Sequence, residues 1–255
     1  MSEKSEKIAL IQSKLKAFAI HLGGSAAIIA VYLALVFLVW YPYPYFAIEK
    51  VWEVIRIVVG VDVFIGPLLT LVVYRAGKAS LKFDMSAIII VQIAALLWGV
   101  SVTYSQRPVY AALVSDNYIF SIVAASDIDS ATIVDPELKT SLWTKPKLVY
   151  VKLPYSDEEY TRIGKENMAI GRTFAQYSQY YLPIDKVKDV VIEHSVDIQA
   201  RMKQFDQLKK DVTGLVKMHG GTIDDYIFVS IEGRVSLGFL MLRREDLQVI
   251  DALLE

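Results

Sequence analysis

Asp62 is the residue whose position most suggests chemistry, because residues 57–74 hold no other charged side chain. An ionised carboxylate inside a bilayer costs about 3 kcal/mol or more, so it should be neutral, paired or hydrated. Two interpretations stay open. Asp62 could recognise a membrane partner or relay protons, or it could bond internally to Gln92 or to another helix. Pro67 cannot donate a hydrogen bond to the carbonyl of Val63, which predicts a kink beside Asp62.

Other reactive side chains are sparse. The chain has three histidines, His21, His194 and His219, and no two of them stand at metal-ligand spacing. There is no cysteine, which excludes disulfides, thiolate metal sites and cysteine nucleophiles. Gly220 and Gly221 read as a helix stop, and no glycine-rich phosphate loop is present. The sequence therefore predicts no catalytic residue, no metal site and no cofactor, and a protein that is not an enzyme.

Hydrophobic residues concentrate in the first 107 positions. Residues 17–48 and 85–106 hold no Asp, Glu, Lys or Arg, and residues 57–74 hold Asp62 alone. A helix needs about 20 apolar residues to cross a bilayer. We predict a tail over residues 1–16, a three-helix membrane region over 17–107 with spans near 17–41, 53–74 and 85–106, and an outer domain over 108–255.

The distribution of basic residues predicts the topology. Lys and Arg favour the cytoplasmic side of membrane helices. The tail and the loop after the second span carry such residues, namely Lys14, Lys16, Arg75, Lys78 and Lys82. Three crossings then place the outer domain on the far side, which is the periplasm if the chain is bacterial. Trp40, Tyr41 and Trp52 are expected to anchor span ends among lipid headgroups.

Small and polar residues form a stripe on each span. Gly66 and Thr70 follow Asp62 at four-residue steps, and Gln92 and Gly99 share a face of the third span. Small faces let membrane helices approach closely. The candidate partner-binding residues are Asp62, Gly66, Pro67, Thr70, Gln92 and Gly99.

The outer domain is predicted to be α+β with antiparallel strands. Residues 109–123 read as a hairpin, 147–153 as a strand, and 226–254 as a three-strand meander whose last piece, 247–254, could instead be helical. Ser156 and Glu159 form a capping box that starts a helix, and apolar periodicity predicts one long helix over 195–218. The domain holds 17 Lys/Arg and 22 Asp/Glu, an acidic balance that argues against nucleic acid.

Several motifs together resemble the type IV pilin accessory proteins of Gram-negative bacteria. They are VWYPYPYF at 39–46, GVDVFIGPLLT at 60–70 and GKASLKFD at 77–84. The resemblance implies an inner-membrane protein that binds a cognate type IV major pilin through its helices and outer domain, and that promotes or tunes pilus assembly without catalysis. It leaves open a contact with the pilus assembly machinery of the inner membrane.

The residues alone also allow other functions. The chain could be a subunit or an assembly factor of another membrane complex. It could instead be a small proton-coupled transporter component that uses Asp62, which would require further polar residues to converge on that carboxylate.

Overall fold

The structure is a computed structural model that describes residues 3–154 and 156–254. It divides into two compact units. The first unit contains Met1–Leu38 and Val51–Ser105, and the second contains Val39–Lys50 and Gln106–Glu255. The chain therefore passes between the units three times, and the segment 39–50 that links the first two long helices belongs to the second unit.

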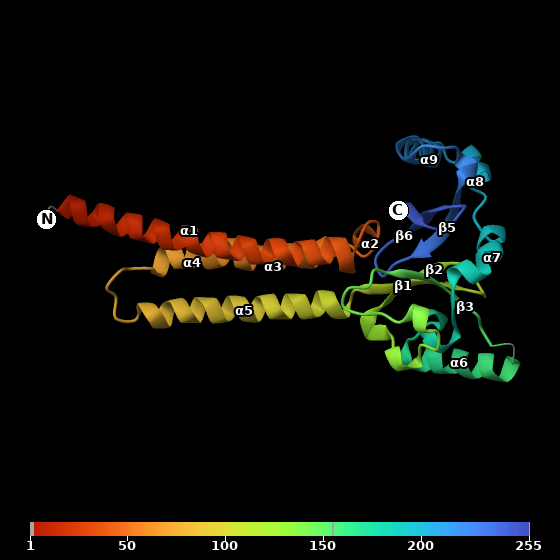
Figure 1. The fold of residues 1–255 in the computed structure, drawn as a ribbon, viewed down its shortest axis with the longest axis horizontal. Coiled ribbons are helices and arrows are strands. Elements are labelled where there is room, and N and C mark those ends of the chain that lie inside the picture. Colours follow the sequence, from red (N-terminus) through yellow and green to blue (C-terminus); the bar gives the residue numbers. More distant parts are fainter. Residues whose placement is uncertain (1–2, 155, 255) are drawn as a thin grey trace. The chain divides into compact units, whose positions relative to one another are not determined.

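The first unit contains three helical spans, except for the last two residues of the first span, Val39 and Trp40, which belong to the second unit. The spans are Lys4–Trp40, Trp52–Val73 and Leu81–Ser105, each long and apolar enough to cross a membrane. The first span is α1 (Glu3–Leu35) with a π-helical end (Val36–Trp40), and the third is α5 (Leu81–Ser105). Figure 1 shows α1 and α5 running alongside the second span. Large apolar side chains point outward along all three, as membrane helices require.

The second span is irregular around Asp62. It comprises α3 (Trp52–Val59), a π-helical stretch (Gly60–Ile65) and α4 (Gly66–Val73). Pro67 is one of the first two residues of α4 and has no amide proton for the helical ladder. The π-helical turn ahead of it accommodates this loss, and such wide turns are frequent at functional sites. The sequence predicted a kink beside Asp62; the structure has a π-helical stretch there, and the kink itself stays a prediction.

The second unit is built on one seven-stranded sheet in the order β4-β3-β1-β2-β5-β6-β7. The strands are β1 (Pro108–Val114), β2 (Phe120–Ala124), β3 (Lys147–Val151), β4 (Tyr181–Pro183), β5 (Tyr226–Glu232), β6 (Leu237–Arg243) and β7 (Val249–Leu254). The β1–β2 hairpin and the β5–β6–β7 meander are confirmed, and the last piece is a strand.

The expectation of antiparallel strands throughout is wrong, because the sheet is mixed. β1 pairs with β3 in parallel, and β2 pairs with β5 in parallel. Both parallel pairs join strands that are distant in the sequence, through long crossover connections. Local alternation of apolar residues predicts strands, and it does not fix the direction in which remote strands pair.

One face of the sheet is covered by two short helices, α2 (Tyr45–Ile48) and α7 (Lys188–Glu193). Tyr45 and Ile48 of α2 pack with Val191 of α7 against alternate residues of β1, β2, β5 and β6. Ile48 and Val191 are fully buried. The segment between the first two spans therefore contributes to the core of the second unit.

The opposite face has two separate coverings. Ile133 and Leu138, from the 3-10 turns after β2, pack on the β1–β3 side. On the β5–β7 side the cover is α8 (Ile198–Gln204) and α9 (Asp206–His219). The single helix predicted over 195–218 is wrong, since Phe205 is extended (φ −129°, ψ 102°) and divides it. Both helices place apolar residues on the same face of the sheet, so the helical periodicity continues across the break.

α6 (Asp157–Ile170) begins as the sequence predicted. The Ser156 hydroxyl accepts a hydrogen bond from the backbone amide of Glu159, and Gly171 ends the helix with φ 68°.

Candidate partner-binding site

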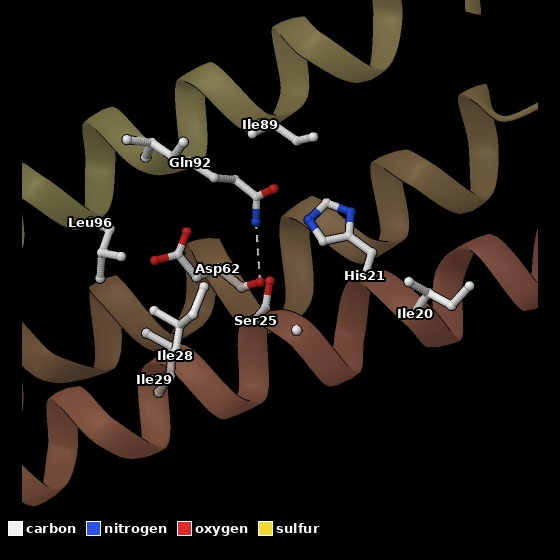
Figure 2. Close-up of a pocket in the computed structure, with 11 residues that line it drawn as sticks. Ile20, His21, Ser25, Ile28, Ile29, Asp62, Ile89, Gln92 and Leu96 are labelled. Carbon is white, nitrogen blue, oxygen red and sulfur yellow. Dashed lines mark hydrogen bonds between the residues drawn. The ribbon is translucent and has the colours of Figure 1, made fainter. Parts of the chain in front are cut away.

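A groove of about 260 Å³ lies within the first unit, between α1 and α5 and over the π-helical turn of the second span. Most of its wall is aliphatic, and Figure 2 shows a few polar side chains directed into it. The lining residues that matter for chemistry are His21 and Ser25 from α1, Asp62 from the second span and Gln92 from α5.

Asp62 is the charged residue that lines this groove. Its side chain is only 5% exposed, and its Oδ2 has no hydrogen-bond partner among the described residues. Asp62 is the eleventh of the 22 residues of Trp52–Val73, which puts it near the middle of that span. A buried carboxylate oxygen is costly without a donor, so this position favours a ligand or partner that supplies one.

Gln92 reaches from α5 across to the second span. Its Nε2 donates to the backbone carbonyl of Asp62 at 3.2 Å. A Cβ added at Gly66 would lie 1.9 Å from that nitrogen, so glycine makes room for the amide. The expected bond between Asp62 and Gln92 thus exists at the main chain, and it leaves Oδ2 of the carboxylate without a donor.

His21 is a part of the site that the predicted set of binding residues missed. Its Nδ1 lies 2.6 Å from the hydroxyl of Thr70, which ties α1 to α4. Both side chains are polar groups at the buried side of the bundle. The sequence feature that could have identified it is its position, because His21 is the single histidine within the stretch 17–48, which holds no Asp, Glu, Lys or Arg.

The other predicted residues lie at contacts between helices. Gly66, Pro67 and Thr70 are buried on the inner face of α4. Gly99 of α5 faces Val58 of α3, where an added Cβ would lie 2.4 Å from the valine Cγ2. The structure therefore brings Asp62 and Gln92 together at the groove. It places Gly66, Pro67, Thr70 and Gly99 where helices pack.

Comparison with known proteins bears on what such a site is for. A family described as "Fimbrial assembly protein FimB" has a sequence model that matches residues 9–49. A fimbrial assembly protein of Dichelobacter nodosus, from serogroups C1 and C2, is 36% identical over 92 residues, which cover 35% of this chain and 70% of the relative.

The chain belongs to the fimbrial assembly protein family. A further family member, the fimbrial assembly protein of serogroup I from the same organism, is 26% identical over 245 residues, or 91% of each chain. No solved structure matches this chain significantly. The matched region 9–49 of the family includes most of α1 and nearly all of the segment 39–50.

The basic residues predicted to set the membrane topology of this fimbrial assembly family member are partly bonded and partly exposed. Lys14 donates to the carbonyl of Val72 at 2.9 Å, near the end of α4, where a cation suits the free carbonyls. Lys78 pairs with Asp84 at 2.5 Å. Lys16, Arg75 and Lys82 are exposed.

The aromatic residues predicted as membrane anchors divide into two groups. Trp40 and Tyr41 are each 2% exposed and belong to the second unit, so little ring surface is left for lipid headgroups. Trp52 is 56% exposed. Anchoring among headgroups remains a prediction for Trp52, and burial within the second unit accounts for the other two.

Glu49 is a buried charge that the sequence analysis overlooked. Its side chain is 1% exposed, and its Oε2 accepts from Nε of Arg234 at 2.6 Å. Arg234 also donates from Nη2 to the carbonyl of Gln106 at 2.8 Å. Within the second unit, this arginine therefore holds together the segment before the second span, the residue that follows the third span, and the β5–β6 turn.

Acidic and histidine side chains do not gather into a metal-binding group in residues 3–154 and 156–254. The groove instead offers a carboxylate, an amide and an imidazole in an aliphatic wall, which suits recognition of a largely apolar partner with a polar group.

Proposed function

We propose that the chain is an inner-membrane fimbrial assembly protein that binds a cognate type IV major pilin as a chaperone or assembly modulator, without catalysis. Its relatives of the same family are named as fimbrial assembly proteins. The three apolar spans supply the membrane association that such a role requires. The motifs at 39–46, 60–70 and 77–84 resemble those of pilin accessory proteins.

In this proposal the N-terminus and the loop between the second and third spans are cytoplasmic, and the second unit is periplasmic. The basic residues Lys14, Lys16, Arg75, Lys78 and Lys82 support that orientation. The domain boundaries follow as a tail over 1–16, a membrane region over 17–107 and a periplasmic domain over 108–255, to which the segment 39–50 is added.

The observation that carries the proposal is the buried Oδ2 of Asp62 beside the groove. A pilin subunit that is still in the membrane before assembly presents a hydrophobic helix. A groove with an aliphatic wall can bind such a helix. A hydrogen-bond donor on that helix would satisfy Asp62. In hydrocarbon such a bond adds both affinity and register to apolar packing.

The second unit would contact the globular head of the same pilin. Its sheet ends in two edge strands, β4 and β7. The three-residue β4 offers little to pair with, whereas β7 has six residues. Addition of a pilin strand to an edge is a common way for a sheet to bind an extended segment. The pilus assembly machinery of the inner membrane is a further proposed partner.

The test is substitution of Asp62 in the full chain in its own cell. Asp62→Leu should lower pilin affinity roughly 10- to 150-fold and reduce co-purification and piliation, because a hydrogen bond to a charged group contributes about 1.5–3 kcal/mol. The control is Leu68→Ala, which changes an exposed side chain of α4. The amount of each variant in the membrane is measured in parallel.

Asp62→Asn separates binding from proton transfer. The amide oxygen still accepts a hydrogen bond, but it cannot carry a proton. Retained piliation in Asp62→Asn with loss in Asp62→Leu supports pilin recognition. Equal loss in both variants would favour the proton-coupled alternative, for which the shared groove of His21 and Asp62 is the specific observation. Normal pili in both would remove Asp62 from the mechanism.

A further inference from the structure

Two loops of the second unit end in exposed apolar side chains, and we call them the span-edge tips. The first tip is Leu142 and Trp143, which are 39% and 69% exposed. The second is Val235 and Leu237 at the β5–β6 turn, which are 52% and 55% exposed. Single exposed apolar residues are common on protein surfaces. These two pairs differ from single exposed residues because the residues next to them in the sequence form hydrogen bonds with chain segments at or beside the ends of the spans.

The first tip is bonded to the end of the first span. The indole Nε1 of Trp40 donates to the carbonyl of Leu142 at 3.0 Å. Trp40 is the last residue of the span Lys4–Trp40. Trp143 is the next residue after that carbonyl, so its exposed ring lies beside the residue that ends the first span.

The second tip is bonded to residues that precede the second span and follow the third span in the sequence. Arg234 binds the carbonyl of Gln106, the residue directly after the span Leu81–Ser105. It also pairs with Glu49, three residues before the span that starts at Trp52. The Ser236 hydroxyl donates to the carbonyl of Ile48 at 2.6 Å. Val235 stands between Arg234 and Ser236, so it is held beside residues that adjoin the second and third spans in the sequence.

We infer that the span-edge tips lie in the lipid headgroup layer and bind the second unit to the membrane surface at two points. The polar layer is about 5–8 Å thick on each side of the hydrocarbon, and side chains fixed beside span ends reach it. Tryptophan prefers this layer, because its ring is apolar and its N–H is polar. Exposed Lys139 and Lys145 flank the first tip, where they can face lipid phosphates.

This attachment explains why apolar side chains remain exposed at both places. Each tip buries apolar area when lipid covers it, and each is held there by hydrogen bonds from residues adjoining spans. The inference does not depend on the identity of the pilin. It concerns the lipid surface, and it would hold for any function of this membrane chain.

The experiment uses site-specific labels, which the cysteine-free sequence makes simple. An environment-sensitive fluorophore is attached to single cysteines at Trp143, Val235 and Lys145 of the full chain. The Lys145→Cys variant keeps Leu142 and Trp143 in place. The matched control is Met168→Cys. Met168 is 90% exposed and lies on α6, which contacts Phe174 and Tyr180. Each variant is reconstituted in vesicles of phosphatidylethanolamine and phosphatidylglycerol.

Quenching by lipids with a nitroxide at the headgroup is compared with quenching by iodide in the water. Labels at 143, 145 and 235 should be quenched several-fold more by the nitroxide lipid than the label at 168, and less by iodide. Equal behaviour of all four labels would overturn the inference. Shielding of the tips from both quenchers would overturn it as well, because it would mean that protein covers them.

Discussion

At the scale of single residues, Tyr45 combines a well-packed ring with an unsatisfied hydroxyl. The side chain is 4% exposed, and its hydroxyl has no hydrogen-bond partner in the described part of the chain. A buried polar group without a partner costs about 1–3 kcal/mol. Tyr45→Phe should therefore raise the free energy of unfolding by about 1 kcal/mol, whereas Tyr45→Ala should lower it by about 3–5 kcal/mol. Thermal unfolding in mild detergent measures both.

The same hydroxyl predicts a response to alkaline pH. Burial raises the pKa of Tyr45 well above its ordinary value. As pH rises past about 10, the unfolded chain loses this proton while the folded chain keeps it, so the folded state loses stability. Stability should fall less steeply above pH of about 10 in Tyr45→Phe than in the parent. Identical alkaline profiles would show that Tyr45 is solvated in the folded protein.

At the scale of helices, Gly99 and Val58 set how closely α5 approaches α3. An alanine methyl at position 99 would lie 2.4 Å from Val58 Cγ2, and a valine in a helix has little freedom to rotate away. Gly99→Ala should cost about 1–3 kcal/mol through overpacking. The double variant Gly99→Ala/Val58→Ala should recover part of that loss. Thermal unfolding of the full chain in detergent would measure it.

The control for that prediction is Gly23→Ala in α1, where an added Cβ meets no atom within 4 Å. Alanine there should leave stability unchanged or slightly raised, since alanine favours helix. A loss in Gly99→Ala that Val58→Ala does not relieve would mean that the two helices are not in contact at this point.

Prediction from the sequence succeeded where the signal was local. The Ser156 N-cap, the hairpin of residues 109–123 and the three spans each follow from a sequence pattern within one element. Of the predicted capping box, the structure shows the bond from the Glu159 amide to the Ser156 hydroxyl. The parallel pairing of β2 with β5 was not predictable, because it joins distant strands. Asp62 was identifiable by its charge within an apolar stretch. Its relation to Gln92 required the packing of two helices.

The segment 39–50 shows a different limit. Its aromatic residues resemble an anchoring belt, and the sequence cannot distinguish a ring that faces lipid from one buried under a sheet. The structure assigns Tyr41, Tyr45 and Ile48 to the second unit. Glu49 was the distinguishing signal, since a charge in this run needs the partner that Arg234 provides.

At the scale of the whole molecule, the second unit is completed by a piece of chain from between two spans. Tyr45 and Ile48 pack in the same cluster as Val191 and the sheet. A soluble fragment of residues 106–255 should therefore expose the surface that α2 covers. A chimera that joins residues 39–50 to Gln106 through a short flexible linker should restore that cover. Arg234 binds both Glu49 and Gln106, so the two ends lie close enough to join.

The chimera should melt roughly 10 °C above the bare fragment, since burial of the two side chains contributes about 3 kcal/mol or more. It should also bind less of a dye that detects exposed apolar surface. A matched chimera with Ile48→Asp should behave like the bare fragment, because Ile48 is fully buried and a carboxylate there finds no water. Equal melting of all three proteins would mean that the sheet folds without α2. The segment 39–50 would then be a linker between spans and not a part of the outer domain.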